Sequence, residues 1–344
     1  MKKNSKPKRL SRRAFVAGSA AAAGGAAIAS TTGIRRARAN LKKVNFITPF
    51  SYLAGFAPVL NAAAGGHFER NGLDVTVLGG KGSAMAVQQV LADRVQFARA
   101  ATLSLVKAVG NEGAELTAIG TILQQSPFYV VSAKSAPINS AKDMPGKVIG
   151  VVARGSGTEN VLDMILATAG VKMDAVQREV AGNGVSGYGL IQQDRIAAFI
   201  PSLGTVVRLR EAGEDIVAWN TDKFVAMPGQ IYLTSNAQIK NDPESCVQFL
   251  RGIKESTAEL KSGDPGKLLD RMAGKFDILG IKDRDFTIKA MVAEWDLWTS
   301  ESSPNLLQND PKRWQGMIDA MHGAGLTELT DAKGLYTNAF YDKI

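Results

Sequence analysis

The 344 residues are 45% apolar and 21% charged, which is typical of a globular chain with about two domains. The net charge of +9 would suit a protein that binds nucleic acid or a membrane surface, but ten of the 41 Lys and Arg residues lie within residues 1–39. The remainder holds 31 basic against 32 acidic side chains, so a basic binding surface is excluded and no nucleic-acid partner is expected.

Residues 1–39 have the pattern of an export signal. Lysines and arginines come first, then Arg12 and Arg13 with Phe15 shortly after them, then an Ala- and Gly-rich stretch over residues 17–33. Paired arginines followed by an aromatic residue resemble a twin-arginine signal, which directs folded proteins out of the cytoplasm. The order of these parts therefore predicts export to the periplasm.

The small residues Ala37 and Ala39 predict cleavage between Ala39 and Asn40. The alternative is a signal that is retained as a membrane anchor, but a stretch with so little Leu or Ile makes a poor anchor. A lipid anchor is not expected, because no cysteine lies near the cleavage site.

Cysteine and histidine offer little reactive chemistry. Cys246 is the only cysteine, so no intrachain disulfide or paired-cysteine site can form, and its apolar neighbours predict a buried side chain. His67 and His322 are far apart in the sequence, lie in polar or glycine-flanked contexts and have no partners at metal-ligand spacing. We therefore expect no catalytic residue, metal or cofactor.

After Asn40 the chain predicts an alternation of strands and helices. Apolar, β-branched stretches predict strands, and apolar residues at helical spacing predict helices. The predicted elements of the first unit are strand 44–47, helix 57–64, strand 74–78, helix 84–91 and strand 95–98.

The same order returns about a hundred residues later. The second unit has strand 148–152, a loop over 154–158, a helix from 159 to 169, strand 176–180, a loop over 181–186, helix 188–193 and strand 196–200. Asp93-Arg94 recurs as Asp194-Arg195 before the third strand of each unit. The repeat predicts two similar Rossmann-like α/β domains, with ligand at the carboxyl ends of their strands and a cleft between them.

Two segments that cross between the units set the domain boundaries. We expect a first domain from residues 40–127 and 229–344, and a second from residues 128–228. Beyond residue 235 the pattern is helical, with Asp-Pro pairs that begin three of the helices. The predicted helices, 243–261, 265–275, 283–299 and 311–323, should pack mainly on the first domain.

Two stretches carry a family resemblance: residues 66–75 (GHFERNGLDV) and residues 140–151 (SAKDMPGKVIGV). They resemble motifs of the solute-binding proteins of ABC importers for nitrate, sulfonates, taurine and the thiamine pyrimidine precursor. The chain departs from that family at Asp93 and Asp194, where the family usually has glycine, and at Gln96 and Ala197, where it usually has aspartate.

The resemblance implies a periplasmic binding protein fold of type II and places His67 in a surface turn. It also implies capture of a small organic anion or heterocycle by domain closure, and delivery to an ABC permease in the inner membrane by a monomeric protein. The alternatives are an enzyme on the same fold, related to pyrimidine-precursor synthesis, and a periplasmic sensory protein. The cysteine-rich motif of the enzyme relatives is absent, since Cys246 stands alone.

The loop Arg154–Thr158 leads from a buried strand into a helix and is the strongest candidate for ligand contact. It would bind the polar or anionic end of a ligand with backbone N–H groups and hydroxyls; the alternative is a tight turn with Thr158 as an ordinary N-cap. Its spacing lacks a third glycine at Asn160, which disfavours a nucleotide site.

Other candidates follow the remaining strand ends. Lys81 would supply a cation to the cleft or point into water, and Arg154 and Lys81 together favour an anionic ligand. Trp219 and Trp295 would form an aromatic wall or belong to the core, and the carboxylates of Glu294 and Asp296 read as a solvated face. The full candidate set is Thr48, Tyr52, Gly80, Lys81, Gly82, Ser83, Ala101, Thr102, Ser126, Arg154, Gly155, Ser156, Gly157, Thr158, Asn183, Gly184, Pro201, Ser202 and Trp219.

Overall fold

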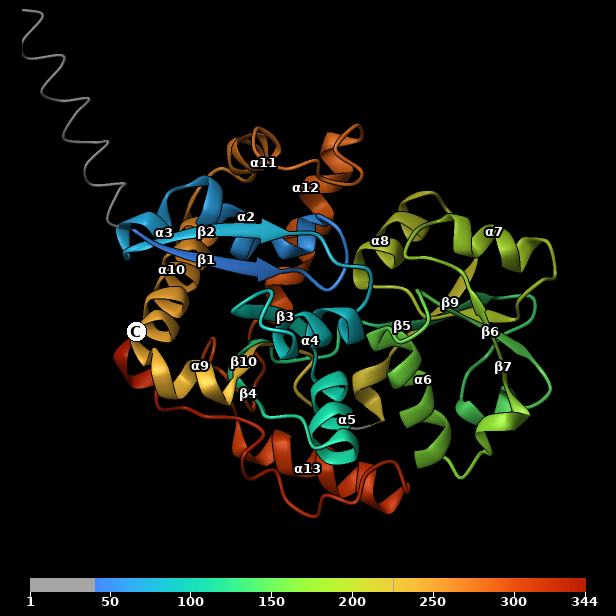
Figure 1. Cartoon of the computed structure of the whole chain (residues 1–344). Coiled ribbons are helices and arrows are strands. Elements are labelled where there is room, and N and C mark those ends of the chain that lie inside the picture. The colour runs from blue at the N-terminus through green and yellow to red at the C-terminus, as the bar shows by residue number, and fades with distance from the viewer. Residues whose placement is uncertain (1–40, 225) are drawn as a thin grey trace, which may run out of the picture. The chain divides into compact units, whose positions relative to one another are not determined.

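The computed structural model describes residues 41–224 and 226–344. The predicted export signal and its cleavage point lie outside the described residues. The rest of the chain forms two five-stranded sheets with helices around them, which confirms the predicted α/β fold (Figure 1). Within the described part of the chain, no helix is long and apolar enough to cross a membrane.

The first sheet has the strand order β2-β1-β3-β10-β4. Its strands are β1 (Lys42–Ile47), β2 (Leu73–Leu78), β3 (Phe97–Ala101), β4 (Leu116–Leu123) and β10 (Gln230–Ser235). Strands β1 and β3 are parallel, whereas β10 runs antiparallel to β3 and β4. Buried and exposed residues alternate along β2, as expected of a strand with one solvated face, whereas every residue of β3 and β4 is buried.

The second sheet repeats this arrangement with the order β7-β6-β8-β5-β9. Its strands are β5 (Tyr129–Ala133), β6 (Val148–Val151), β7 (Gln177–Val180), β8 (Ala198–Phe199) and β9 (Ile216–Asn220). Strand β6 is parallel to both β7 and β8, and β5 is antiparallel to β8 and β9. Each sheet therefore combines parallel strands with one antiparallel strand, β10 in the first sheet and β5 in the second.

Helices connect the strands of each sheet. Around the first sheet lie α2 (Ala57–Ala64), α3 (His67–Arg70), α4 (Ser83–Leu91), α5 (Thr102–Glu112) and the short turn η1 (Ala54–Phe56). Around the second lie η2 (Ala141–Asp143), α6 (Gly157–Thr168), η3 (Met173–Ala175), α7 (Ser186–Gln192), α8 (Leu203–Glu211) and η4 (Thr221–Lys223).

The C-terminal region is helical, as predicted. It contains α9 (Asn236–Asn241), α10 (Pro243–Ser262), α11 (Pro265–Ala273), α12 (Arg284–Ala293), η5 (Glu294–Leu297), α13 (Pro311–Gly323) and η6 (Tyr341–Lys343). Helices α10 and α11 pack on α2, beside the first sheet (Figure 1). Not every contact of these helices is with the first domain, because α12 also contacts α8 and α13 contacts α6.

The repeated Asp-Arg turns share an unusual backbone conformation. Asp93 has φ of 52° and Asp194 has φ of 54°, both in the left-handed region. Glycine enters this region without steric cost, and aspartate is one of the few other residues that tolerates it. The structure thus explains why aspartate can stand where the resembled family has glycine.

A β-branched residue at this turn should destabilise the protein. We expect Asp194→Val to lower the free energy of unfolding by about 1–2 kcal/mol, because its side chain would clash with the left-handed backbone. The matched control is Gln193→Val, one residue earlier, where φ is −95° and no such penalty applies. Denaturant titration of both variants measures the difference, and equal losses would contradict the strain.

Two segments cross between the sheets, one from β4 to β5 and one from η4 to β10. They lie against each other: the Gly229 N–H donates to the Leu123 carbonyl over 2.8 Å, and a Cβ at Gly229 would collide with the Gln125 carbonyl. Arg313 of α13 is buried and donates to the Asp222 carboxylate and to the Met227 carbonyl at 2.9 Å. The C-terminal helices thus fasten the second crossing.

Candidate functional site

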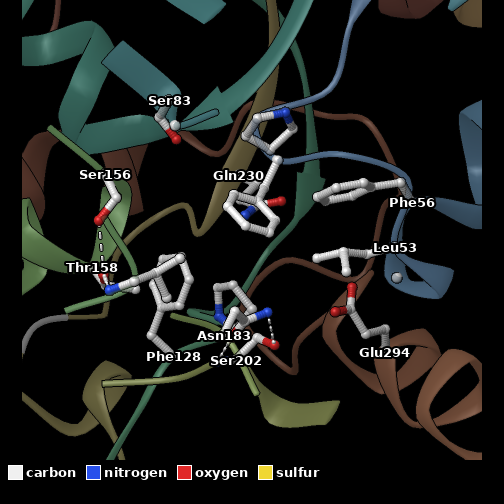
Figure 2. Close-up of a pocket in the computed structure, with 17 residues that line it drawn as sticks. Leu53, Phe56, Ser83, Phe128, Ser156, Thr158, Asn183, Ser202, Gln230 and Glu294 are labelled. Carbon is white, nitrogen blue, oxygen red and sulfur yellow. Dashed lines mark hydrogen bonds between the residues drawn. The ribbon is translucent and has the colours of Figure 1, made fainter. Parts of the chain in front are cut away.

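A pocket of about 570 Å³, including its open mouth, lies at the strand ends of both sheets. The first sheet and its turns contribute Pro49, Phe50, Leu53, Gly55, Phe56, Gly82, Ser83 and Gln230, together with Glu294 of η5. The second sheet and the crossing contribute Pro127, Phe128, Val152, Ser156, Gly157, Thr158, Asn183 and Ser202. Figure 2 shows these two groups facing the same space.

The N-terminus of α6 forms one wall. Ser156 is the N-cap of α6 and its side chain accepts from the Glu159 N–H. Thr158 lies inside the first turn, so the alternative of Thr158 as the N-cap is wrong. The hydroxyl of Thr158 accepts from the Val152 N–H at 2.9 Å and lies 2.8 Å from the Ser156 hydroxyl. The N–H groups of Gly157 and Thr158 have no acceptor one turn earlier in the helix, so this wall offers hydrogen-bond donors and the positive end of a helix dipole.

Asn183 and Ser202 form a second polar edge of the same sheet. The Asn183 side-chain amide donates to the Ser202 hydroxyl over 3.0 Å, and the Ser202 backbone N–H donates back to Oδ1 of Asn183 over 2.8 Å. This reciprocal pair fixes the orientation of both side chains at the mouth of the pocket (Figure 2).

The wall from the first sheet is mainly apolar. Phe50 and Phe56 line the pocket on this side together with Leu53, and Phe128 contributes a third ring from the crossing. The Ser83 hydroxyl is buried and accepts from the Ala101 N–H at 3.1 Å, so its acceptor capacity is partly used within the protein. Aromatic faces with a few fixed polar groups are typical of sites for small organic molecules.

Glu294 is the ionisable side chain in this lining. Only 9% of the residue is exposed, and its Oε2 atom, which has no hydrogen-bond partner among the described residues, lies 3.7 Å from Nη2 of Arg99. Burial raises the pKa of Glu294 to about 7, although the nearby Arg99 charge opposes the shift. The expectation of a solvated face at Glu294 and Asp296 is therefore wrong for Glu294 and holds for the exposed Asp296.

Arg99 lies beneath the pocket and is completely buried on β3. Its Nε donates to the Gln230 side-chain carbonyl at 2.6 Å, and its Nη1 donates to the Gly55 carbonyl at 3.0 Å. Its guanidinium also lies 4.8 Å from the centre of the Phe56 ring. Arg99 thus positions three pocket residues at once, Gln230, Gly55 and Glu294, without lining the pocket itself.

A second hollow adjoins the first and shares six lining residues with it: Phe50, Leu53, Gly55, Asn183, Ser202 and Glu294. It extends toward α8 and α12, where Arg208 stacks 3.6 Å from the centre of the Phe286 ring and pairs with Asp283 at 2.8 Å. Because the two hollows adjoin, together they leave room for a ligand longer than one ring.

The structure brings part of the candidate set together. Seven candidates line the pocket: Gly82, Ser83, Ser156, Gly157, Thr158, Asn183 and Ser202. Gly184 lines the adjoining hollow. The candidates outside the lining of either hollow are Thr48, Tyr52, Gly80, Lys81, Ala101, Thr102, Ser126, Arg154, Gly155, Pro201 and Trp219.

The two candidate cations lie outside the lining. Arg154 donates to the Glu159 carboxylate at 2.7 Å and to the Arg178 carbonyl at 2.9 Å, with 60% of its side chain exposed. Lys81 is exposed at the turn before α4. Both charges are therefore held at the surface rather than among the residues that face the pocket.

Trp219 and several hydroxyl candidates have structural contacts. The Trp219 indole donates to the Ile138 carbonyl at 2.8 Å and packs against Phe224, and Tyr52 donates to the Val77 carbonyl at 3.2 Å. The Thr48 hydroxyl donates to the Ser51 carbonyl, and the Ser126 hydroxyl lies 2.7 Å from that of Thr221. These contacts fasten the turns and the crossings that surround the pocket.

Sequence reasoning missed Gln230, Glu294 and the apolar lining residues Phe50, Leu53, Phe56 and Phe128. The signal that could have found Phe50, Leu53 and Phe56 is their position directly after the first strand, close to the candidates Thr48 and Tyr52. The expectation of a surface turn was also wrong for His67, which is 5% exposed with Nε2 at 2.7 Å from Glu259. Among the described residues, no group of three or more His, Cys, Asp and Glu side chains could hold a metal ion.

A family model described as NMT1/THI5 like matches residues 54–264 of the chain. No curated protein sequence matches this chain. Glu294 lies beyond the matched range, whereas the loop over residues 154–158 lies inside it.

Solved structures share the fold at low sequence identity. A protein of Bordetella bronchiseptica RB50 is 18% identical with a TM-score of 0.71, covering 88% of this chain and 97% of its own. The alkanesulfonate-binding protein of Xanthomonas axonopodis pv. citri bound to MOPS is 12% identical with a TM-score of 0.65, covering 86% and 98%. The periplasmic nitrate-binding protein of Synechocystis PCC 6803 is 9% identical with a TM-score of 0.63, covering 88% of each chain.

Proposed function

The chain belongs to the NMT1/THI5-like family, and on that premise we propose that it is an extracytoplasmic solute-binding protein of an ABC importer. It captures a small molecule between its two sheets and delivers it to a permease in the inner membrane. The observation that carries the proposal is the pocket itself, which both sheets line at their strand ends and into which the N-terminus of α6 faces.

Binding in this pocket needs no covalent chemistry. The N–H groups at the start of α6 hold an acceptor or anionic group of the ligand, together with one hydroxyl hydrogen of the Ser156–Thr158 pair, since the other hydrogen bonds the two hydroxyls to each other. The rings of Phe50, Phe56 and Phe128 pack against its apolar part. This combination supports a small organic anion or heterocycle, and the sulfonate- and nitrate-binding proteins of the same fold are consistent with that class.

Closure around the ligand would be a hinge motion at the two crossings. We assign residues 40–127 and 229–344 to one domain and residues 128–228 to the other. The close packing of Gly229 against Gln125 places both crossings at one point, as a hinge requires. The protein acts as a monomer in the periplasm after export through the predicted signal.

Two other roles suit the same fold. The enzymatic alternative finds little support, because no His, Cys or Lys side chain is among the described residues that line either hollow. A sensory role would use the same pocket and a receptor instead of a permease; the genes that accompany this one would separate the two roles.

A thermal-shift screen of the purified protein against sulfonates, aromatic carboxylates, nitrate and pyrimidines tests the proposal. A ligand present at a hundred times its Kd stabilises the folded state by about 2.7 kcal/mol, which should raise Tm by about 5 °C in a protein of this size. A screen in which no member of any class raises Tm would contradict the proposed function.

A further inference from the structure

Glu294 gives the pocket a second polar end, on the side opposite the N-terminus of α6. Figure 2 shows its carboxyl group directed into the pocket, across from Ser156 and Thr158. The α6 wall presents N–H donors, whereas the Glu294 end presents carboxyl oxygens. The pocket is therefore bipolar, with aromatic rings between its ends.

The carboxyl group is held in place from beneath. A Cβ at Gly55 would collide with Oε1 of Glu294, so only glycine at this turn lets the carboxyl group lie flat against the backbone. Arg99 lies 3.7 Å from Oε2. Because Glu294 lines the pocket and Arg99 does not, a ligand meets the carboxyl group and not the guanidinium group.

The Oε2 atom is buried and has no hydrogen-bond donor among the described residues. An oxygen removed from water without a donor is costly, so such atoms are usually satisfied by a partner. The Arg99 ion pair compensates for part of this cost but contributes no hydrogen bond. Oε2 faces Arg99, so a ligand in the pocket would meet the rest of the carboxyl group, and a donor from a bound molecule there would stabilise the incompletely paired carboxylate.

We propose that Glu294 is a specificity-determining contact that accepts a hydrogen bond from an amine or N–H group of the ligand. The preferred ligand thus has an acceptor or anionic group at one end, a ring or other apolar part in the middle, and a donor at the other end. This inference rests on the proposed function, since it concerns the same pocket.

Matched pairs of probes separate the donor from the rest of the ligand. The pairs are 4-(aminomethyl)benzoate with 4-methylbenzoate, and 4-aminobenzenesulfonate with benzenesulfonate. In calorimetric titrations at pH 8.5, the amino member of at least one pair should bind at least tenfold more tightly than its partner. In Glu294→Gln that margin should shrink to less than about threefold, while Asp296→Asn, an exposed carboxylate in the same turn, should retain it.

The pH dependence of the wild type gives a second readout that does not depend on the variant's stability. The pKa of Glu294 is raised to about 7 by burial, and the ligand's donor needs the ionised form. Besides Arg99, the charged or titratable groups on the surrounding elements are Arg208 in the adjoining hollow and Tyr232 of β10, which lies opposite Arg99. Affinity for 4-(aminomethyl)benzoate should therefore fall about 30-fold between pH 8.5 and 5.5, while that for 4-methylbenzoate should change little.

The possible outcomes separate a failure of the Glu294 contact from a failure of the proposed function. If the donor-free members bind and the amino members show no margin, or if the margin survives in Glu294→Gln or grows as the pH falls, the donor contact is wrong and the proposed function stands. If no member of either pair binds, nor any compound in the wider screen, the proposed function fails and this inference fails with it.

Discussion

Replacing Phe249 with alanine should lower the free energy of unfolding by about 3–5 kcal/mol. Phe249 of α10 is fully buried and stacks on three rings of the first sheet's core, Phe97 at 4.6 Å, Phe68 at 5.3 Å and Phe46 at 5.6 Å between centroids. The Tyr232 ring meets it edge-on at 5.3 Å. Alanine would leave a cavity among rigid rings that cannot collapse to fill it.

Denaturant unfolding measures this loss as a lower midpoint at an unchanged slope. The control is Leu91→Ala, at the end of α4, where 40% of the residue is exposed and the loss should stay below about 1 kcal/mol. A small loss for Phe249→Ala would mean that α10 does not complete the core of the first sheet.

Replacing Arg99 with methionine should cost about 3–5 kcal/mol at pH 8, because it removes the cation from a buried ion pair and leaves the Glu294 carboxylate alone. It also removes the donors to Gln230 and to the Gly55 carbonyl. Loss of these contacts should also disturb the pocket, because Arg99 positions Gln230, Gly55 and Glu294 in the pocket lining.

The loss should depend on pH in a defined direction. The pKa of Glu294 is about 7 in the folded protein and ordinarily 4.5, so the folded state holds this proton more tightly than the unfolded state. The stability that this group contributes is therefore lost as the pH rises from about 4.5 through 7. Without Arg99, whose charge lowers the pKa of Glu294, this loss continues to higher pH. Arg99→Met should thus be less damaging at pH 5 than at pH 8.

The double variant Arg99→Met with Glu294→Gln is the matched control. It carries no buried charge at either position, so most of the pH dependence should disappear and part of the stability should return. Equal losses for the single variant at pH 5 and pH 8 would show that Glu294 does not hold a proton as described.

Much of the fold could be predicted from the sequence because its signals are local. Strand and helix periods predicted the first three strands of each unit and the helices between them, and the Asp-Pro pairs marked true helix starts, whereas α5, β4 and α8 were not predicted. Asp264 accepts from the Lys267 N–H at 2.8 Å, and Asp310 accepts from the Lys312 N–H at 2.9 Å. The predicted helix over 283–299 was too long, since α12 ends at Ala293 and continues as a 3₁₀ turn.

The site was less predictable because its determinants are distant in sequence. The buried position of Glu294 arises from a contact with Gly55 and Arg99 far earlier in the chain, and no local pattern distinguishes it from exposed Asp296. Arg154 is the opposite case, a residue that the sequence favoured and the structure places outside the pocket lining. A cation in a glycine-rich loop predicts anion binding, but Glu159 of the following helix pairs with this cation. Strand ends locate a pocket, whereas tertiary pairing decides which side chains face it.

The measurement that tests the account most directly is calorimetric titration of the strongest hit from the ligand screen against two variants of one loop. Thr158→Val keeps the side-chain shape but removes the hydroxyl that holds the Val152 N–H and the Ser156 hydroxyl in the pocket wall. Arg154→Met removes a charge from the same loop outside the pocket lining. Melting curves of both variants establish that they are folded.

We predict that Thr158→Val weakens binding about tenfold or more, while Arg154→Met changes the Kd less than about twofold. The reverse result, with binding lost in Arg154→Met and retained in Thr158→Val, would contradict a ligand held in the pocket at the N-terminus of α6.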